Sequence, residues 1–374
     1  MDAGNMTESS WSKRGMERSM TADYRGKKIA VAMSGGVDSS TVAALLQRQG
    51  AQVIGINMKL FAREGEDPGA KGDAEIVADY LGIEFHQVRL EEQFARLIVE
   101  DFRAQYFSGE TPNPCVRCNR YVKFGLLLDK ALELGADLLA TGHYVRTRQD
   151  DDGLWHLLKA ACLAKDQSYF LYTLTQRQLS RVVFPLGEMP SKDEVRRLAA
   201  GFGLPVAQKG DSQEICFIPG DDYVAFLEKD RAVAAAPGDI VHVNGTVLGR
   251  HNGTHRYTIG QRRGLGIAWK EPLYVVSIDA ARERIVVGEQ EGLFAPGLRV
   301  TDLNWIVAPE GETIETACKI RYRQQPVACS VTLSGDASGE IRFAEPQKSV
   351  TPGQSVVFYR DDELVGGGRI TSKI

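Results

Sequence analysis

Several features are scarce or missing in the 374-residue sequence. No apolar run approaches the length of a membrane span, so we expect no membrane partner. Residues 1–25 are polar and lack the apolar core of a secretory signal, which predicts a disordered tail over residues 1–26 or a late start codon. Six cysteines are too few for a secreted disulfide framework in a chain of this size. We therefore expect a cytoplasmic protein whose cysteines are inert, catalytic or metal-bound.

An excess of charge of one sign is also lacking. The chain has 45 basic and 49 acidic residues, a formal net charge of −4, so any nucleic-acid surface must be a local patch. A hydrophobic content of 43% and a charged content of 25% are typical of a globular protein. The length allows two or three domains, each with its own core.

The clearest motif, SGGVDSS at residues 34–40, lacks the lysine of a Walker phosphate-binding loop. It follows an apolar run at 29–33 that predicts a buried strand, and it precedes a helical pattern at 41–50 that ends in glycine. Two glycines allow the backbone N–H groups to point at one spot, where the helix dipole adds positive potential. An ordinary turn is the alternative, but the seven residues resemble the PP-loop of ATP pyrophosphatases, which predicts a nucleotide site.

Strands and helices alternate over residues 27 to about 146, which predicts a doubly wound parallel sheet with ligands at the carboxyl ends of its strands. The expected strands are 29–33, 51–58, 83–88 and 136–141, and the later helices are 73–81, 93–106 and 119–134. Residues 165–200 have a helical pattern, with a capping box at Ser191 and Glu194.

Beyond Pro237 the pattern changes to short β-type runs separated by glycine, and from Gly297 the runs lengthen. This predicts a small β-rich central domain followed by a C-terminal β-barrel. The runs are 240–243, 246–248, 274–278, 284–288, 303–307, 315–320, 328–333, 339–343 and 355–359. The expected domains are 27–225 for the ATP-binding catalytic part, 226–294 for the central part and 295–374 for the barrel.

Cys115 and Cys118 form a C-x-x-C motif behind two prolines. The prolines predict an irregular loop before Cys115, running into a helix that starts near Asn119. A thiolate at a helix N-terminus is stabilised by the dipole, and Arg117 and Arg120 add positive charge. Spacing alone leaves three interpretations open: an inert thiol, a zinc or iron–sulfur ligand, and a nucleophile. A second C-x-x-C that would complete a zinc site is missing.

The other cysteines give weaker local signals. Cys216 has apolar neighbours, so a buried inert cysteine is the simplest interpretation of that position. Cys162, Cys318 and Cys329 lie in ordinary apolar runs and are expected to be structural.

Together, the motifs resemble those of tRNA-specific 2-thiouridylases, the MnmA/TrmU family. Besides the loop at 34–40, they are TPNPCxxCNxxxKF at 111–124, ATGHY at 140–144, KDQSYFL at 165–171, GDSQEICFI at 210–218, RYR at 321–323 and TPGQ at 351–354. The similarity covers residues 27–374. The loop is shared with many ATP pyrophosphatases, whereas the two cysteine motifs and KDQSYF are far more specific.

The resemblance implies ATP-dependent sulfur transfer onto the wobble uridine of a tRNA, giving 2-thiouridine, AMP and pyrophosphate. ATP, with Mg²⁺, would adenylate the oxygen at position 2 of the uracil ring. A persulfide on Cys216 would deliver sulfur, and Cys118 would be the nucleophile that releases it, as sulfide or by closing a Cys118–Cys216 disulfide. The implied partners are tRNA, with lysine, glutamate and glutamine acceptors, and a cysteine desulfurase or sulfur-relay protein.

The resemblance also implies two sets of binding residues and assigns no metal ligand. Residues expected to contact ATP are Ala32, Met33, Ser34, Gly35, Gly36, Val37, Asp38, Ser39, Met58 and Gly142. Residues expected to contact tRNA are Asn113, Pro114, Cys115, His143, Lys165, Asp166, Gln167, Arg321, Tyr322 and Gln354. Splayed anticodon bases and their phosphates suit such polar and basic groups.

Three alternatives remain open. Some relatives carry aspartate where this chain has Cys115, so an acid–base role of that carboxylate cannot be assigned to position 115. In the first alternative, Cys115, Cys118 and Cys216 together hold a [4Fe–4S] cluster with one iron open for sulfide. A PP-loop amidoligase, in which an amine attacks the adenylate, would not depend on the cysteines. A non-catalytic tRNA-binding module would not consume ATP.

Overall fold

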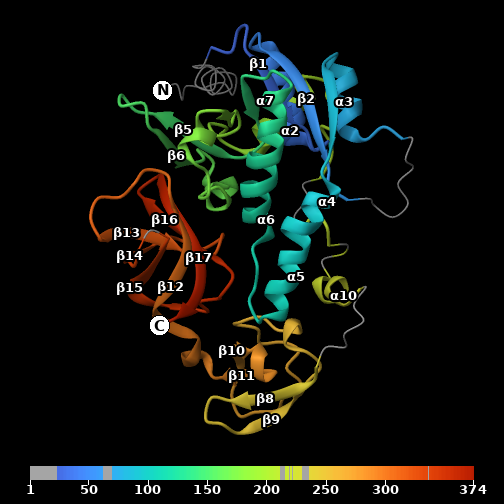
Figure 1. The fold of residues 1–374 in the computed structure, drawn as a ribbon. Coiled ribbons are helices and arrows are strands. Elements are labelled where there is room, and N and C mark those ends of the chain that lie inside the picture. The colour runs from blue at the N-terminus through green and yellow to red at the C-terminus, as the bar shows by residue number, and fades with distance from the viewer. Residues whose placement is uncertain are drawn as a thin grey trace, which may run out of the picture. The chain divides into compact units, whose positions relative to one another are not determined.

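The computed structural model describes residues 23–61, 70–210, 215–218, 220, 222–229, 236–335 and 337–374 (Figure 1). Most of the expected N-terminal tail and residues 211–214 of the second cysteine motif lie outside the described residues. Two compact units divide the chain. Unit 1 comprises the described residues of Met1–Ala95, Asn119–Gln213 and Asp362–Leu364, and unit 2 those of Arg96–Cys118, Glu214–Asp361 and Val365–Ile374.

Unit 1 contains a five-stranded sheet in the order β3-β2-β1-β4-β7, and every pairing is parallel. The strands are β1 (Lys28–Ala32), β2 (Gln52–Lys59), β3 (Glu84–Arg89), β4 (Leu138–Ala140) and β7 (Val182–Val183). The helices are α2 (Val37–Arg48), α3 (Asp73–Leu81), α4 (Glu91–Phe94), α7 (Leu128–Glu133), α8 (Gln176–Leu179) and α9 (Lys192–Gly201). The predicted doubly wound parallel sheet is confirmed.

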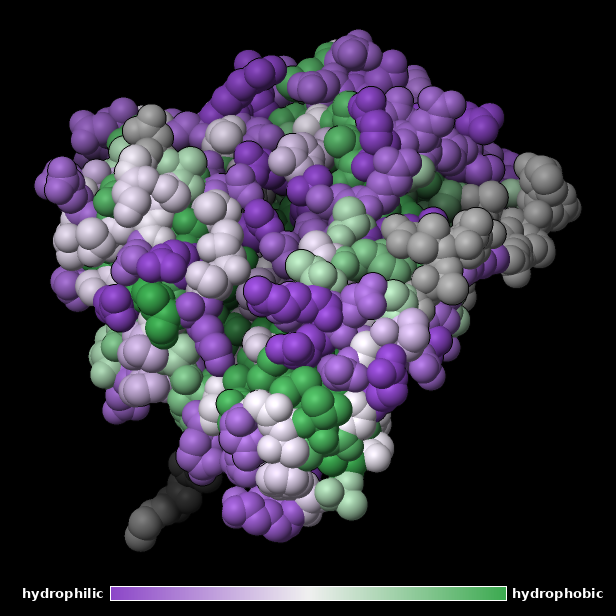
Figure 2. Space-filling view, turned by 60° about the horizontal axis from the view of Figure 1, so that its bottom comes forward, coloured by the Kyte–Doolittle hydropathy of each residue, from purple (hydrophilic) through white to green (hydrophobic). Residues whose placement is uncertain are grey.

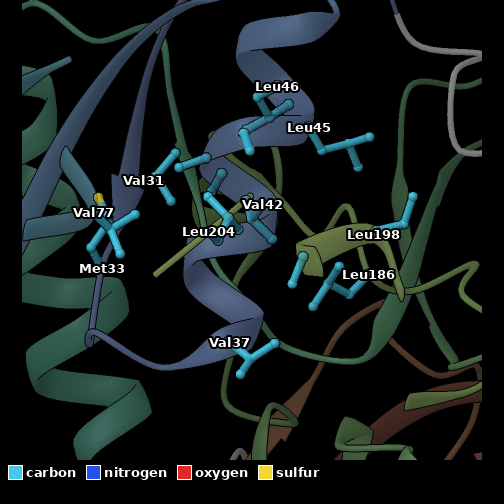
Figure 3. Packing of buried hydrophobic residues seen from close by; sticks show 14 of the residues in the cluster. Val31, Met33, Val37, Val42, Leu45, Leu46, Val77, Leu186, Leu198 and Leu204 are labelled. Atoms are coloured by element: carbon cyan, nitrogen blue, oxygen red, sulfur yellow. The ribbon is translucent and has the colours of Figure 1, made fainter. Parts of the chain in front are cut away.

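Helix α2 forms the centre of the unit 1 core because nearly all of its surface is buried. Figure 3 shows β1 side chains such as Val31 on one side of this helix and Leu186 and Leu198 on the other. Val42 and Leu46 are fully buried, and each buried aliphatic side chain of this size contributes about 1.5–3 kcal/mol. This packing fixes where the N-terminus of α2 lies.

The helical pattern expected over residues 165–200 is wrong for residues 165–191 and holds only from Lys192. Here the chain forms two 3₁₀ turns, the four-residue helix α8 and strand β7 before α9 begins. Apolar residues recur here at a helix-like spacing because several short elements each bury single apolar residues, such as Tyr169, Leu174 and Leu179. The sequence pattern also missed a hairpin of β5 (Val145–Gln149) and β6 (Trp155–Lys159).

Residues 111–113 are irregular as expected, but the helix predicted to start near Asn119 begins earlier, at Pro114. Helix α6 (Pro114–Arg117) continues into a π-helical stretch, Cys118–Leu127, and then into α7. Proline is favoured at the first helical position, where its missing N–H is not needed and its φ is already helical. Asn113 caps this start by accepting a hydrogen bond from the N–H of Val116 at 3.3 Å.

Unit 2 holds two β structures. A four-stranded sheet, in the order β10-β11-β8-β9, is built from β8 (Gly238–His242), β9 (Val247–His251), β10 (Tyr274–Asp279) and β11 (Arg284–Gly288). A six-stranded barrel follows, in the order β12-β15-β14-β13-β16-β17, and pairing of β12 with β17 closes it. Its strands are β12 (Phe294–Trp305), β13 (Thr313–Lys319), β14 (Val327–Leu333), β15 (Ser338–Lys348), β16 (Ser355–Arg360) and β17 (Glu363–Lys373). Both predicted β structures are confirmed.

Unit 2 has two more helices, α5 (Glu100–Phe107) and α10 (Tyr223–Glu228). Their aromatic rings are in contact, Tyr106 stacked on Tyr223 and Phe102 edge-to-face with Phe226. In the barrel core, Cys318 and Cys329 are buried, as expected for structural thiols. The hydrogen bond with Cys329, together with burial, raises the pKa of Cys318, so that its thiol stays protonated.

Among the described residues, hydrophobic cores lie in unit 1 and in each β structure of unit 2. Hydrophilic residues cover most of the face drawn in Figure 2, and hydrophobic residues form smaller areas on it. Among the described residues, no helix is both long and apolar enough to cross a membrane.

Candidate active site

The turn between β1 and α2 needs glycine for two reasons. Gly35 has a φ of 73°, in the left-handed region, and a Cβ there would lie 2.6 Å from the Cβ of Asp73 and 2.9 Å from the backbone nitrogen of Ala74. Gly36 is the N-cap of α2, and no side chain of the described residues caps this helix. The first N–H groups of α2 can therefore bind an anion, with the helix dipole in its favour.

Hydroxyl groups stabilise this loop from within. Ser39 accepts a hydrogen bond from the N–H of Ser34 at 3.2 Å, and its Oγ lies 3.3 Å from the Oγ of Ser34. Ser40 donates to the carbonyl of Gly36 at 2.8 Å. Ser39 and Ser40 are buried, Gly36 is half-buried and Ser34 is exposed. Ser34, Gly36 and the half-buried Asp38 are therefore the loop residues that a ligand can reach.

Asp38, the second residue of α2, carries the one charge of the loop. Its carboxylate accepts hydrogen bonds from Lys192, whose Nζ lies 2.7 Å from both oxygens, and from the hydroxyl of Tyr144 at 2.7 Å. Lys209 donates to the carbonyl of Gly35 at 3.2 Å and pairs with Asp73. Sequence reasoning missed both lysines, although the missing Walker lysine indicated that a cation must come from elsewhere.

The outlying ATP-contacting positions of the prediction lie at the same sheet edge as the loop. Met58 is near the carboxyl end of β2, which pairs with β1 in parallel, and the neighbouring Asn57 donates to the carbonyl of Met33 at 2.7 Å. Gly142 follows β4, and a Cβ on it would lie 3.0 Å from the Cβ of Asp38. The carboxyl ends of β1, β2 and β4 thus bring the predicted set together.

Three predicted tRNA-contacting residues of unit 1 have partners inside the protein. Asp166 is buried and accepts hydrogen bonds from the hydroxyl of Ser168 at 2.8 Å and the N–H of Ala160 at 3.0 Å. Gln167 accepts from the N–H of Tyr144 at 2.9 Å. Because Tyr144 in turn binds Asp38, the KDQ motif supports the first turn of α2.

The third of these residues, His143, packs near the rings of Phe124 and Phe184, with centroid distances of 5.7 and 6.2 Å. Its Nδ1 lies 2.7 Å from the hydroxyl of Thr141. Burial, together with the nearby charge of Lys123, lowers the pKa of His143 well below its usual value. The imidazole is therefore neutral at physiological pH and can accept or donate a hydrogen bond without carrying charge.

The three cysteines of the two motifs all belong to unit 2 and differ in exposure. Cys118 is buried, whereas Cys115 and Cys216 are exposed. The interpretation of Cys216 as a buried cysteine is therefore wrong, because its neighbours Phe217 and Ile218 fill the core instead. These apolar neighbours explain the misleading local pattern.

The positive charge expected beside the C-x-x-C motif is partly used elsewhere. Arg117 pairs with Asp101 at 2.9 Å and donates to the carbonyl of Leu97 at 3.2 Å. This ion pair ties α6 to the preceding helical segment. Arg117 therefore orients the cysteine helix within unit 2 as well as contributing charge.

The barrel supports the segment that leads into Cys115. Gln354 donates to the carbonyls of Thr111 and Pro112 at 2.9 and 3.1 Å, and the N–H of Thr111 donates to the carbonyl of Pro352 at 2.9 Å. Gly353 has a φ of 89°, and a Cβ there would lie 2.8 Å from the carbonyl oxygen of Thr111. The TPGQ and TPNP motifs thus lie against each other.

Other predicted tRNA-contacting residues occupy the same unit. Arg321 is exposed and donates to the carbonyl of Lys348 at 2.7 Å, and Tyr322 follows it in the turn after β13. Among the described residues, no three His, Cys, Asp or Glu side chains are grouped closely enough to hold a metal ion.

Comparison with known proteins gives consistent matches along the chain. Three family models match consecutive segments: the tRNA methyl transferase HUP domain at residues 27–220, the tRNA methyl transferase PRC-barrel domain at 225–289 and the aminomethyltransferase beta-barrel domain at 295–370. Curated relatives match over nearly their whole length, which makes their names more specific than those of single domains.

Three such relatives are tRNA-specific 2-thiouridylases MnmA. The protein of Pelobacter propionicus is 64% identical over 93% of this chain and 98% of its own length. That of Trichlorobacter lovleyi is 62% identical over 92% and 97%, and that of Geobacter metallireducens is 58% identical over 92% and 96%. The chain belongs to the family of tRNA-specific 2-thiouridylases.

Proposed function

We propose that the chain is a tRNA-uridine 2-sulfurtransferase that uses ATP to replace the oxygen at position 2 of the wobble uridine with sulfur. The observation that carries the proposal is a phosphate-binding loop and two distant cysteine motifs in one chain, matched over nearly full length by thiouridylases. An amidoligase or a binding module gives no reason for both cysteine motifs.

In the first step, the uracil oxygen attacks the α-phosphorus of ATP, and pyrophosphate leaves. The N–H groups at the start of α2, with the hydroxyl of Ser34, would hold the leaving phosphates and stabilise their growing charge. Met58 and Gly142 would border the adenosine. Mg²⁺, when bound, supplies further neutralisation of the polyphosphate.

In the second step, the thiolate of Cys118 attacks the Sγ of the Cys216 persulfide. The bond between this Sγ and the outer sulfur breaks, and the outer sulfur forms a bond to C2 of the uridine. AMP leaves with the former uracil oxygen, and a Cys118–Cys216 disulfide remains. A thiol reductant supplies two electrons and two protons to restore the thiols before the next persulfide forms.

The different exposure of the two thiols supports these roles. Exposed Cys216 can be reached by a sulfur donor, either a cysteine desulfurase or a relay protein, whereas buried Cys118 is shielded from chance oxidation. Lysine, glutamate and glutamine tRNAs are the proposed acceptors. This proposal also includes the three predicted domains and the remaining predicted tRNA contacts. These contacts are Asn113 to Cys115, His143, the KDQ motif, Arg321, Tyr322 and Gln354.

The experiment is thiolation of an unmodified tRNA, with ATP, Mg²⁺ and a sulfur source, by the wild type and by Cys118→Ser and Cys216→Ser. Cys162→Ser is the matched control, because Cys162 is a half-exposed cysteine outside both motifs. We expect both site variants to lose thiolation while AMP formation continues, and the control to remain active.

Iron is assayed in each sample, with Cys115→Ser added. An active, iron-free wild type and an active Cys115→Ser support the persulfide relay. Iron bound to the wild type and lost from all three variants would replace it with the cluster chemistry. Full activity of Cys118→Ser or Cys216→Ser would contradict the assignment of the sulfur chemistry.

A further inference from the structure

The phosphate loop poses a problem of charge. Residues 34–40 contain no lysine or arginine, while Asp38 places a carboxylate in the first turn of α2. This carboxylate competes with any polyphosphate for the positive end of the helix dipole. Like charges repel most strongly where protein shields them from water, and the side chain of Asp38 is only 32% exposed. A cation is needed to make this end of α2 attractive to ATP.

Lys192 meets this need from a distant part of the chain. Its Nζ lies 2.7 Å from both carboxylate oxygens of Asp38, and its side chain is only 10% exposed. The hydroxyl of Tyr144 donates to one of the same oxygens, and the ammonium lies 5.9 Å from the centre of the Tyr144 ring. The carboxylate is thereby held by three hydrogen bonds from Lys192 and Tyr144.

The position of Lys192 in its own helix shows that local stability does not explain it. It is the first residue of α9, directly after the N-cap Ser191, whose side chain accepts from the N–H of Glu194 at 3.1 Å. A cation at a helix N-terminus opposes the dipole, and burial adds a further cost. A residue that breaks such a local rule is expected where function requires it.

The packing of the core fixes the ammonium in place. Helix α9 packs against α2 through the shared core that includes Leu45 and Leu198 (Figure 3). Lys192 therefore reaches Asp38 from a rigid element. This favours a permanent part of the loop over a mobile surface cation.

We propose that Lys192 supplies the cation missing from the loop: it neutralises and positions Asp38 and so sets the affinity of the α2 N-terminus for the polyphosphate of ATP. The inference rests on the proposed function, because it assumes that this loop binds ATP. Lys192 acts through Asp38 and is thus a positioning residue. Its effect should depend on the phosphates of the ligand and not on the adenosine.

The test is equilibrium binding of a non-hydrolysable ATP analogue and of adenosine to the full chain with Mg²⁺ and without tRNA. We expect Lys192→Met to weaken binding of the analogue by about tenfold or more and to leave adenosine binding unchanged. Lys192→Arg should keep most of the affinity. Lys130→Met is the matched control, because Lys130 forms an exposed ion pair with Glu133 and should bind like the wild type.

A double-mutant cycle covers the case in which Lys192→Met folds poorly. If Lys192 acts by neutralising Asp38, then Asp38→Asn should restore analogue binding in the Lys192→Met background. Equal analogue affinity of the wild type and Lys192→Met overturns the inference alone, and so does an equal loss for analogue and adenosine. A wild type that binds no analogue overturns the proposed nucleotide site as well.

Discussion

Replacing Gly35 with alanine should damage the phosphate loop through two separable effects. The backbone at Gly35 is left-handed, with a φ of 73°. The new Cβ would also lie 2.6 Å from the Cβ of Asp73 and 2.9 Å from the backbone nitrogen of Ala74, at the start of α3. Backbone atoms cannot rotate out of the way, so either α3 or the loop must shift.

Gly82 allows the two effects to be measured separately. It ends α3 with a φ of 64°, and a Cβ there meets nothing within 4 Å. The left-handed conformation costs alanine about 1–2 kcal/mol, and reduced freedom of the unfolded chain offsets about 0.4–1 kcal/mol of this. Gly82→Ala should therefore lower the free energy of unfolding by about 0–1.5 kcal/mol. Gly35→Ala should lose about 1–3 kcal/mol more, the usual cost of overpacking.

Urea unfolding and ATP-analogue binding measure the two consequences. Because the shift must reach either the loop itself or the start of α3, Gly35→Ala should bind the analogue at least about tenfold more weakly, whereas Gly82→Ala should bind like the wild type. If the two variants match in both stability and affinity, the close approach of the loop to α3 does not explain why glycine is needed at position 35.

Two further predictions concern other contacts. Gln354→Ala removes the donors to the carbonyls of Thr111 and Pro112. It should therefore lower the free energy of unfolding by about 1–3 kcal/mol and speed alkylation of the exposed Cys115, compared with the conservative variant Gln354→Asn. Unchanged alkylation would contradict the positioning role of Gln354. Burial alone would lower the pKa of His156, but its hydrogen bonds to Asp150 and Glu363 outweigh this and raise it. The stabilising effect of charged His156 is therefore full below its ordinary pKa of about 6.5 and is lost as pH rises through the raised value. The melting temperature should accordingly fall more in His156→Gln at about pH 6 than at about pH 9.

The sequence predicted those parts of the fold that have a repeating pattern. The bounds of α3, Asp73–Leu81, match the expected range, and the bounds of β1 and β2 lie within one residue of the expected ones. Strand β7 has only two residues, too few to show a period of two, and it was missed. The early start of helix α6 was missed because two prolines so close together usually exclude a helix. Pro114 is instead the favoured first residue of the helix, directly after the N-cap Asn113.

The contacts that shape the site could not be predicted from local patterns. Lys192 and Asp38 are separated by 154 positions, and Gln354 and Thr111 by 243. Only the folded chain brings each pair together, because parallel sheets and a closed barrel join segments that are distant in sequence.

One clue to such a contact was nevertheless local. The Ser191-x-x-Glu194 pattern predicts where α9 begins, and the structure confirms Ser191 as its N-cap. Lys192 then occupies the first helical position, where its charge opposes the dipole, while Asp193 and Glu194 follow the rule. Such an exception indicates that an anionic partner lies elsewhere in the chain, although it does not name it. The Asp38 carboxylate in the phosphate loop is that partner. The unfavourable placement of the Lys192 charge at the N-terminus of α9 is offset because this charge neutralises Asp38, and the loop can then bind an anion.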